Sequence, residues 1–276
     1  MIPSWGFLRI IILGLFPAAV VALSMFVGRN IFVAMFVMHW TAMVIVPVGF
    51  LYYIHGKTEI RWYMDYIRQQ ELLPDWRICV GLLFLGCLVP LLSYMVDSCR
   101  TLSWHFCVGR VDENLAKYGF EDASKGLIIA CAVYFPIVNP IIEELFWRVF
   151  MDREYTLQSP KLSDDDEASY LVENGDAASL IKSTNSQYIP ISVKLVFSSL
   201  YSSYHTMVVG VFLGGVQYGI LAFFCIAGLG LIFQYIFSAS DPKRGFFRAV
   251  FLHIGIDAGV VIALGDAVGW YSILPS

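Results

Sequence analysis

Seven apolar runs, each about long enough to cross a lipid bilayer as a helix, divide this 276-residue chain. They lie at residues 5–28, 31–54, 78–96, 127–151, 192–215, 216–240 and 246–265. None shows the alternation of polar and apolar residues that a membrane-spanning β-strand requires. Because 58% of the residues are hydrophobic and only 14% are charged, the composition also argues against a soluble domain. The sequence therefore predicts an all-α, polytopic transmembrane helix bundle with about seven spans, within a range of six to eight.

The polar connections indicate how the bundle is organised. We interpret residues 1–276 as a single integral membrane domain, in which 1–126 supplies N-terminal spans and surface segments and 127–265 carries the polar motifs described below. Segment 152–190 is rich in acidic residues, Ser and Asn and cannot bury enough apolar surface to fold alone, so we predict a disordered loop. Segment 56–77 is predicted either to lie at the membrane surface or to form an ordinary solvated connecting helix.

Charge gives the orientation and excludes one class of partner. When the seven spans alternate in direction, most Lys and Arg residues fall on one side, which places the N-terminus and the 152–190 loop in the cytoplasm. The net charge of −4 comes largely from that loop, and no basic patch indicates nucleic acid. The six cysteines form no CxxC pair, although Cys99 and Cys107 share one predicted loop and could bridge.

Ionisable side chains inside the apolar runs are the main indication of function. Such groups are costly in a bilayer unless they are paired or hydrated, so each one is a candidate functional residue. Three of the predicted spans carry them. The residues are Glu143, Glu144 and Arg148 in the fourth span, Tyr201 and His205 in the fifth, and His253 and Asp257 in the seventh.

Their spacing suggests how they are arranged. Glu144 and Arg148 are four residues apart with the acid first, which favours an ion pair on one helix face. Glu143 is rotated by about 100° from Glu144 and is left free. Tyr201 lies one turn before His205 and is expected to pack on it or hydrogen-bond to it. Because the candidate groups of the three spans lie roughly 10–18 Å from the same side of the membrane, we expect them to meet in one site.

Three short motifs carry a resemblance to a known family. EELFWR at 143–148 fits EExxxR, YSSYH at 201–205 fits aromatic-xxx-His, and HIGID at 253–257 fits HxxxN/D. In this order, on three predicted spans, they resemble the type II CAAX prenyl endopeptidases, a family of glutamate intramembrane proteases that includes bacteriocin-processing relatives. The resemblance covers about residues 127–260, and it implies that 127–265 is the catalytic core.

The resemblance implies a role for each matched residue. Glu143 would be the general base that activates a water molecule, and His205 would help to hold and deprotonate that water. His253 and Asp257 match groups that stabilise the oxyanion formed when water attacks the scissile carbonyl. The positions that would order the site are Glu144, Arg148 and Tyr201.

One matched position departs from the commoner family pattern. Many members have Asn where this chain has Asp257, and an ionised Asp cannot donate a hydrogen bond to an oxyanion. Either Asp257 is protonated, or it accepts a hydrogen bond from His253 and leaves His253 to stabilise the charge alone. Tyr201 also replaces the more usual Phe, a change that keeps the aromatic ring.

The resemblance also implies a substrate and a location. The scissile peptide bond would lie near the C-terminus of a prenylated CAAX protein. The expected partners are that prenylated protein or peptide and membrane lipid, with no nucleic acid and no cofactor. The membrane would be that of the endoplasmic reticulum in a eukaryote and the plasma membrane in a bacterium.

Four alternatives stay open at this point. The chain could be a protease of the same family with a different peptide substrate. It could be a zinc hydrolase that uses His205, His253 and a carboxylate, so zinc is not excluded, although the HExxH spacing is missing. It could be a proton-coupled transporter, against which the lack of an internal repeat counts. Finally, it could be a catalytically silent membrane scaffold, a reading that the Asp257 departure keeps open.

Overall fold

A computed structural model describes residues 4–71, 75–99, 113–158, 189–213, 215–239 and 243–267 of the chain. These residues are almost entirely helical, and no strand occurs among them. The elements are α1 (Ser4–Phe26), α2 (Ile31–Val37), η1 (Met38–Ile45), α3 (Val46–Phe50), η2 (Leu51–His55), α4 (Lys57–Arg68), α5 (Trp76–Cys99), α7 (Lys125–Glu144), η4 (Leu145–Phe150), α8 (Met151–Gln158), α11 (Ile191–Phe212), α12 (Val216–Ala239) and α13 (Gly245–Ala267). The segments labelled η are π-helical, with wider turns than an α-helix.

Long helices account for the predicted spans. Within the described residues, six helical stretches are long and apolar enough to cross a membrane, and α5 supplies a further apolar helix that is shorter over its apolar part. Several of these stretches join successive elements, such as α2 to η2 and α7 to α8. The predicted all-α polytopic bundle is therefore confirmed. The chain is an integral membrane protein.

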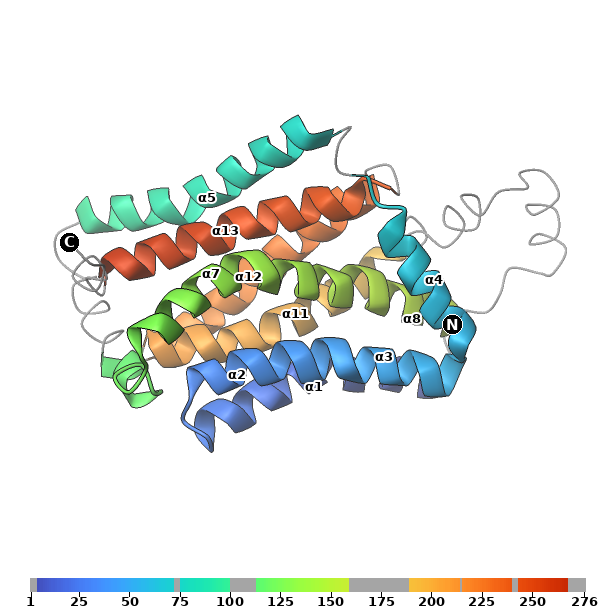
Figure 1. Cartoon of the computed structure of the whole chain (residues 1–276), viewed down its shortest axis with the longest axis horizontal. Coiled ribbons are helices and arrows are strands. Elements are labelled where there is room, and N and C mark those ends of the chain that lie inside the picture. The colour runs from blue at the N-terminus through green and yellow to red at the C-terminus, as the bar shows by residue number, and fades with distance from the viewer. Residues whose placement is uncertain are drawn as a thin grey trace, which may run out of the picture.

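The spans run roughly side by side along the long axis of the molecule (Figure 1). The helix α7 packs against α13 and η1, while α11 packs against α1 and α12. The amphipathic helix α4 crosses one end of the bundle and lies beside α8 in that view. This arrangement brings α7, α11 and α13, which hold the predicted motifs, into the interior of one bundle.

Glycines allow α5 to contact α13 closely along its length (Figure 1). A methyl group added at Gly255 would overlap the Leu83 carbonyl oxygen, and one added at Gly86 would overlap the Leu252 carbonyl oxygen. Gly259 likewise lies against the α5 backbone. Small residues at such crossings let two membrane helices approach backbone to backbone. Gly255 and Gly259 therefore let α13 approach the α5 backbone closely.

The fourth span is longer than the sequence suggested. The helix α7 is continuous through the buried Pro136 and Pro140, and η4 and α8 extend it to Gln158. The predicted loop is therefore helical at 152–158, over about two turns. Its first residues are polar but buried against other helices, which made them look like loop in the sequence. The rest of that predicted loop, 159–188, lies outside the described residues, as does Cys107.

Large side chains from several helices fill the space beside the polar motifs. Phe146, Trp147 and Phe150 are fully buried and pack with Tyr201 and Tyr204 of α11. The Trp147 ring stacks near the Tyr204 ring, with 6.4 Å between centroids, and meets Tyr201 edge-on at 5.9 Å. Trp147 and Phe146 are thus packing residues of the interior, and they fix α7 and η4 against α11.

Candidate active site

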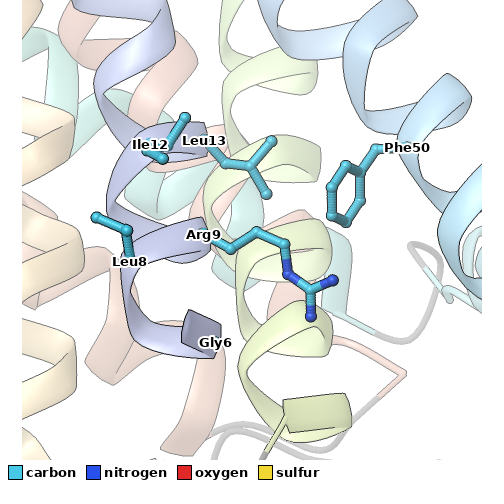
Figure 2. Close-up of a pocket in the computed structure, with 6 residues that line it drawn as sticks. All are labelled: Gly6, Leu8, Arg9, Ile12, Leu13 and Phe50. Carbon is cyan, nitrogen blue, oxygen red and sulfur yellow. The ribbon is translucent and has the colours of Figure 1, made fainter. Parts of the chain in front are cut away.

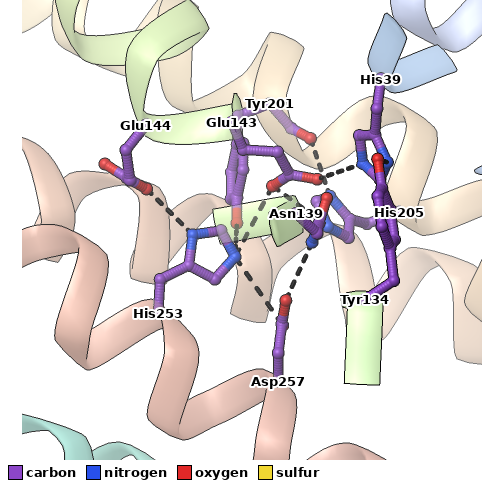
Figure 3. Close-up of polar contacts among 9 residues, drawn as sticks. All are labelled: His39, Tyr134, Asn139, Glu143, Glu144, Tyr201, His205, His253 and Asp257. Carbon is purple, nitrogen blue, oxygen red and sulfur yellow. Dashed lines mark hydrogen bonds and ion pairs between the residues drawn. The ribbon is translucent and has the colours of Figure 1, made fainter. Parts of the chain in front are cut away.

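Glu143 is the centre of a buried polar cluster (Figure 3). Its side chain lies near the end of α7 and only 1% of the residue is exposed. Three histidines from three different helices approach its carboxylate. They are His39 of η1, His205 of α11 and His253 of α13. The structure thus brings together the groups predicted on the fourth, fifth and seventh spans and adds one from the second.

The two oxygens of Glu143 face different histidines. His39 Nε2 lies 3.5 Å from Oε1. On the other side, His253 Nε2 lies 3.6 Å and His205 Nε2 4.0 Å from Oε2. These separations are at or beyond the long limit of a hydrogen bond. Glu143 is therefore surrounded by hydrogen-bonding groups without being tightly bound by any of them.

Glu144 has the opposite character, because its partners hold it closely. Its Oε2 lies 3.4 Å from Arg148 Nε, and its Oε1 accepts a hydrogen bond from His253 Nδ1 at 3.0 Å. All three side chains are almost fully buried. The predicted pairing of Glu144 with Arg148 is present, and the same carboxylate also joins α7 to α13.

Aromatic rings surround the Arg148 guanidinium. Its Cζ atom lies 5.2 Å from the centroid of the Tyr201 ring and 5.5 Å from that of Phe233. Cations are attracted to ring faces at such distances, most strongly where water is excluded. Together with Glu144, these rings hold the buried positive charge of Arg148 in place at the back of the cluster.

His205 has a defined tautomer. Its Nδ1 lies 3.1 Å from the backbone oxygen of Tyr201, one helical turn earlier. A carbonyl oxygen can only accept, so Nδ1 must carry a hydrogen and donate it. In the neutral ring, Nε2 is then an acceptor that faces Glu143. The Tyr201 ring also packs on the imidazole with 4.8 Å between centroids, as the spacing of the two residues predicted.

His253 is fixed at one nitrogen and surrounded at the other. Because Nδ1 donates to Glu144, Nε2 is the nitrogen that faces the cluster. The Tyr201 hydroxyl lies 3.3 Å from Nε2, and Asp257 Oδ1 lies 3.8 Å from it. The Phe233 ring stacks on the imidazole at 4.9 Å. The orientation of His253 is therefore set by Glu144 and Phe233.

Asp257 has a closer partner than His253. The side-chain amide of Asn139 donates to Asp257 Oδ2 at 2.9 Å, and both residues are buried. Asn139 lies one turn before Glu143 on α7, so its amide reaches the same cluster (Figure 3). A carboxylate that accepts this bond does not need a proton to be satisfied. The sequence did not suggest this hydrogen bond between Asn139 and Asp257.

Three residues of the cluster were missed from the sequence: His39, Tyr134 and Asn139. None belongs to the three motifs, and each is a single polar residue in an apolar run. His39 could have been recognised as a candidate, because placing an imidazole inside the second predicted span costs free energy, as it does for the other buried ionisable groups. Its partners could not be read, since residues 39 and 143 are linked only by the packing of η1 against α7.

An open groove of about 570 Å³ lies elsewhere, between α1 and α3 (Figure 2). It is lined mainly by apolar residues of α1 and by Phe50 of α3, with Arg9 at one side. Arg9 Nε pairs with the buried Glu154 of α8 at 3.2 Å, and His55 Nε2 lies 2.7 Å from the same carboxylate. None of the cluster residues around Glu143 lines this groove.

The side chains around Glu143 are of the kinds that zinc prefers as ligands. Among the residues that the structure describes, no group of three His, Cys, Asp or Glu side chains has the geometry to hold one metal ion. The histidines also divide between the two oxygens of Glu143. These three histidines therefore do not converge on one point as the ligands of a single metal ion do.

Fold and cluster together define a class: a polytopic membrane protein with a cluster of Glu and His side chains buried among its helices. The model of one family, described as "Type II CAAX prenyl endopeptidase Rce1-like", matches residues 125–259. The matched segment is just under half of the chain and contains all three motifs, and the match agrees with the protease family that they suggested. Neither a curated protein nor a solved structure shows significant similarity to the chain.

Proposed function

We propose that the protein is an intramembrane endopeptidase that hydrolyses a peptide bond near the C-terminus of prenylated CAAX proteins, with a water molecule activated by Glu143 and His205. One observation carries the proposal. Glu143 Oε2 faces His205 Nε2 at 4.0 Å and His253 Nε2 at 3.6 Å inside a buried cluster. Polar atoms at these separations are suited to a bridging water.

Glu143 and His205 would prepare the nucleophile. In its neutral form, His205 Nε2 accepts one hydrogen of the water, while Glu143 Oε2 accepts the other and takes that proton as the oxygen attacks the carbonyl carbon. Collapse of the tetrahedral intermediate breaks the C–N bond. The proton held by Glu143 then passes to the leaving amine, which returns the carboxylate to its starting state.

The oxyanion would be stabilised on the His253 side of the cluster. The protonated ring donates from Nε2, and the Glu144 carboxylate at Nδ1 stabilises the imidazolium. The Tyr201 hydroxyl, 3.3 Å from Nε2, is a second donor at the same place. Arg148 pairs with Glu144 and holds its carboxylate in position. Glu144, Arg148 and Tyr201 therefore order the site, as the resemblance implied.

Asp257 would act through Asn139. It accepts one amide hydrogen of Asn139 at 2.9 Å, which fixes the amide plane and directs the second amide hydrogen elsewhere in the cluster. This arrangement would supply a neutral donor although the position of the usual family Asn holds an acid. Asp257 is thereby given a role that requires neither its own protonation nor a hydrogen bond from His253.

The family description and the membrane setting support the choice of substrate. The matched family is one of CAAX prenyl endopeptidases, and a cluster buried among membrane helices suits a substrate whose lipid lies in the bilayer while its peptide comes from water. The Lys and Arg distribution supports a cytoplasmic N-terminus and 152–190 segment. In a eukaryote, the corresponding membrane is the endoplasmic reticulum, and in a bacterium it is the plasma membrane.

The test is a cleavage assay with purified protein in nanodiscs. The substrate is a farnesylated peptide ending in a CAAX sequence, and mass spectrometry locates the cut. We expect release of the last three residues by the wild type, and a loss of roughly 10²–10⁴-fold in kcat/KM for Glu143→Ala and His205→Ala. Glu121→Gln, which changes an exposed acid, is the matched control and should cleave like the wild type.

Each outcome bears on a different part of the proposal. Cleavage that survives both substitutions would contradict the roles given to Glu143 and His205. Cleavage of an unprenylated peptide at the same rate would contradict the lipid requirement and favour another peptide substrate. No cleavage of any prenylated peptide, by protein shown to be folded, would contradict the CAAX assignment.

A further inference from the structure

Among the described residues drawn in Figure 3, His39 alone comes from outside the segment matched by the family model, 125–259. It lies in η1, on the second membrane span, and only 1% of it is exposed. An imidazole at this depth is costly unless its nitrogens have partners. The partners of His39 are therefore the guide to what it does.

The local backbone is unusual where His39 meets Glu143. His39 lies in the π-helical η1, and Glu143 lies just before the π-helical η4. Such wide turns are rare in helices and are frequent at functional sites, because they redirect side chains that a regular helix would place elsewhere. Two separate spans thus depart from regular helix at the point where they meet.

The ring of His39 joins Glu143 to Tyr134. Its Nε2 lies 3.5 Å from Glu143 Oε1, and its Nδ1 lies 3.5 Å from the Tyr134 hydroxyl (Figure 3). Because a carboxylate can only accept, Nε2 is the ring nitrogen that donates toward Glu143, and Nδ1 accepts from the Tyr134 hydroxyl. The proton of the neutral His39 ring is then on Nε2, directed at Glu143.

This chain of contacts leaves the two oxygens of Glu143 with different tasks. Oε1 faces the donor on His39, whereas Oε2 faces His205 and His253. A donor beside Oε1 favours the orientation of the carboxylate in which Oε1 points to His39 and Oε2 points away from it. The other oxygen then stays in the place where a base is needed, which is the kind of alignment on which rate depends steeply.

We propose that His39 is a positioning residue: by donating from Nε2 to Glu143 Oε1, in the tautomer selected by Tyr134, it keeps Glu143 Oε2 directed at the water. The proposal rests on the proposed function of Glu143 as the base. It also means that the second span, which lies outside the matched segment, completes the site. His39 does not touch the substrate in this arrangement.

The first test measures kcat and KM for the farnesylated CAAX peptide with His39→Gln, His39→Asn and His39→Ala. The amide nitrogen of Gln takes nearly the place of Nε2 and that of Asn nearly the place of Nδ1. We expect His39→Asn and His39→Ala to lower kcat by roughly 10- to 100-fold with little change in KM, and His39→Gln to recover most of the loss. His55→Gln, which changes another histidine of the same span, is the matched control.

A purely structural role would give a different pattern. It would make the kcat of correctly folded protein equal for the Gln, Asn and Ala variants, with only the thermal midpoints differing. That result, or full kcat in His39→Ala, would overturn the proposal while leaving cleavage by the wild type, and hence the proposed function, intact.

The second test needs no substrate. NMR of protein labelled with ¹⁵N at histidine reports which ring nitrogen carries hydrogen, and the His39 signal is assigned by its loss in His39→Gln. We expect Nε2–H in the wild type and loss of that preference in Tyr134→Phe. A His39 ring protonated on Nδ1 alone would overturn the proposal, even for a protein that cleaves none of the prenylated peptides.

Discussion

Two buried glutamates on the same long span have very different surroundings. Glu154 of α8 is held by Arg9 at 3.2 Å, by His55 at 2.7 Å and by a hydrogen bond from Gln158. Glu143 is also buried and also faces histidines, but its contacts run from 3.5 to 4.0 Å. A saturated carboxylate can only fasten helices together. A loosely surrounded one keeps the capacity to bind and deprotonate something else.

The largest effect is expected from removing the loosely held charge. Glu143→Gln keeps the shape of the side chain but removes the base, so kcat/KM for the peptide should fall by roughly 10³-fold or more. The thermal midpoint should stay the same or rise, because functional groups often reduce stability. Parallel measurements of cleavage and of thermal unfolding check the expected fall in kcat/KM and the expected thermal midpoint. A large loss of stability would show that Glu143 is structural, like Glu154.

A smaller effect should follow from changing the partner of Asp257. Asn139→Asp places two buried carboxylates together, and we expect kcat to fall roughly 10- to 100-fold through the displaced groups. The double variant Asn139→Asp with Asp257→Asn restores an amide–carboxylate pair in the reverse order. Its kcat should recover at least partly, as coupled neighbours do. Equal losses in the single and double variants would contradict the pairing described for these two residues.

The tightly held glutamate should show the reverse behaviour to Glu143. Glu154→Gln removes the anion shared by Arg9 and His55, so the free energy of unfolding should fall by roughly 1–3 kcal/mol. The lower end is favoured because Arg9 is about one-third exposed and can reach water. The kcat of the folded protein should stay within about twofold, since this cluster lies away from Glu143. A loss of kcat without a loss of stability would remove the contrast between the two glutamates.

The smallest expected effect is that of a chelator. Three histidines around a carboxylate resemble a zinc donor set, but their geometry in the described residues does not fit one ion. Cleavage by protein treated with a strong chelator should therefore continue at an unchanged rate, and metal analysis of the active protein should find no stoichiometric zinc. Inactivation by the chelator, with recovery on adding zinc, would establish the zinc reading instead.

The sequence predicted most of the helices and the motif residues that meet in the cluster. Both depend on local patterns, because runs of apolar residues define the spans and fixed spacing places Glu144 near Arg148. Contacts between helices could not be predicted as well from the sequence. The bond from His253 to Glu144, the amide of Asn139 on Asp257 and the approach of His39 each join residues about 100 positions apart. Residues 152–158 were predicted as loop although they are helical, because polar residues such as Glu154 are buried by partners on other spans.

The close contact of α5 with α13 also limits how a lipid-bearing molecule could reach the cluster. Where Gly86 and Gly255 meet the opposite backbone, the two helices touch without intervening side chains, and an isoprenoid chain cannot pass between them. The side of α13 that faces α5 is therefore closed to a lipid chain. Any lateral route from the bilayer to His253 and Glu143 must open at a different seam of the bundle, so a cross-link between α5 and α13 should leave substrate entry unaffected.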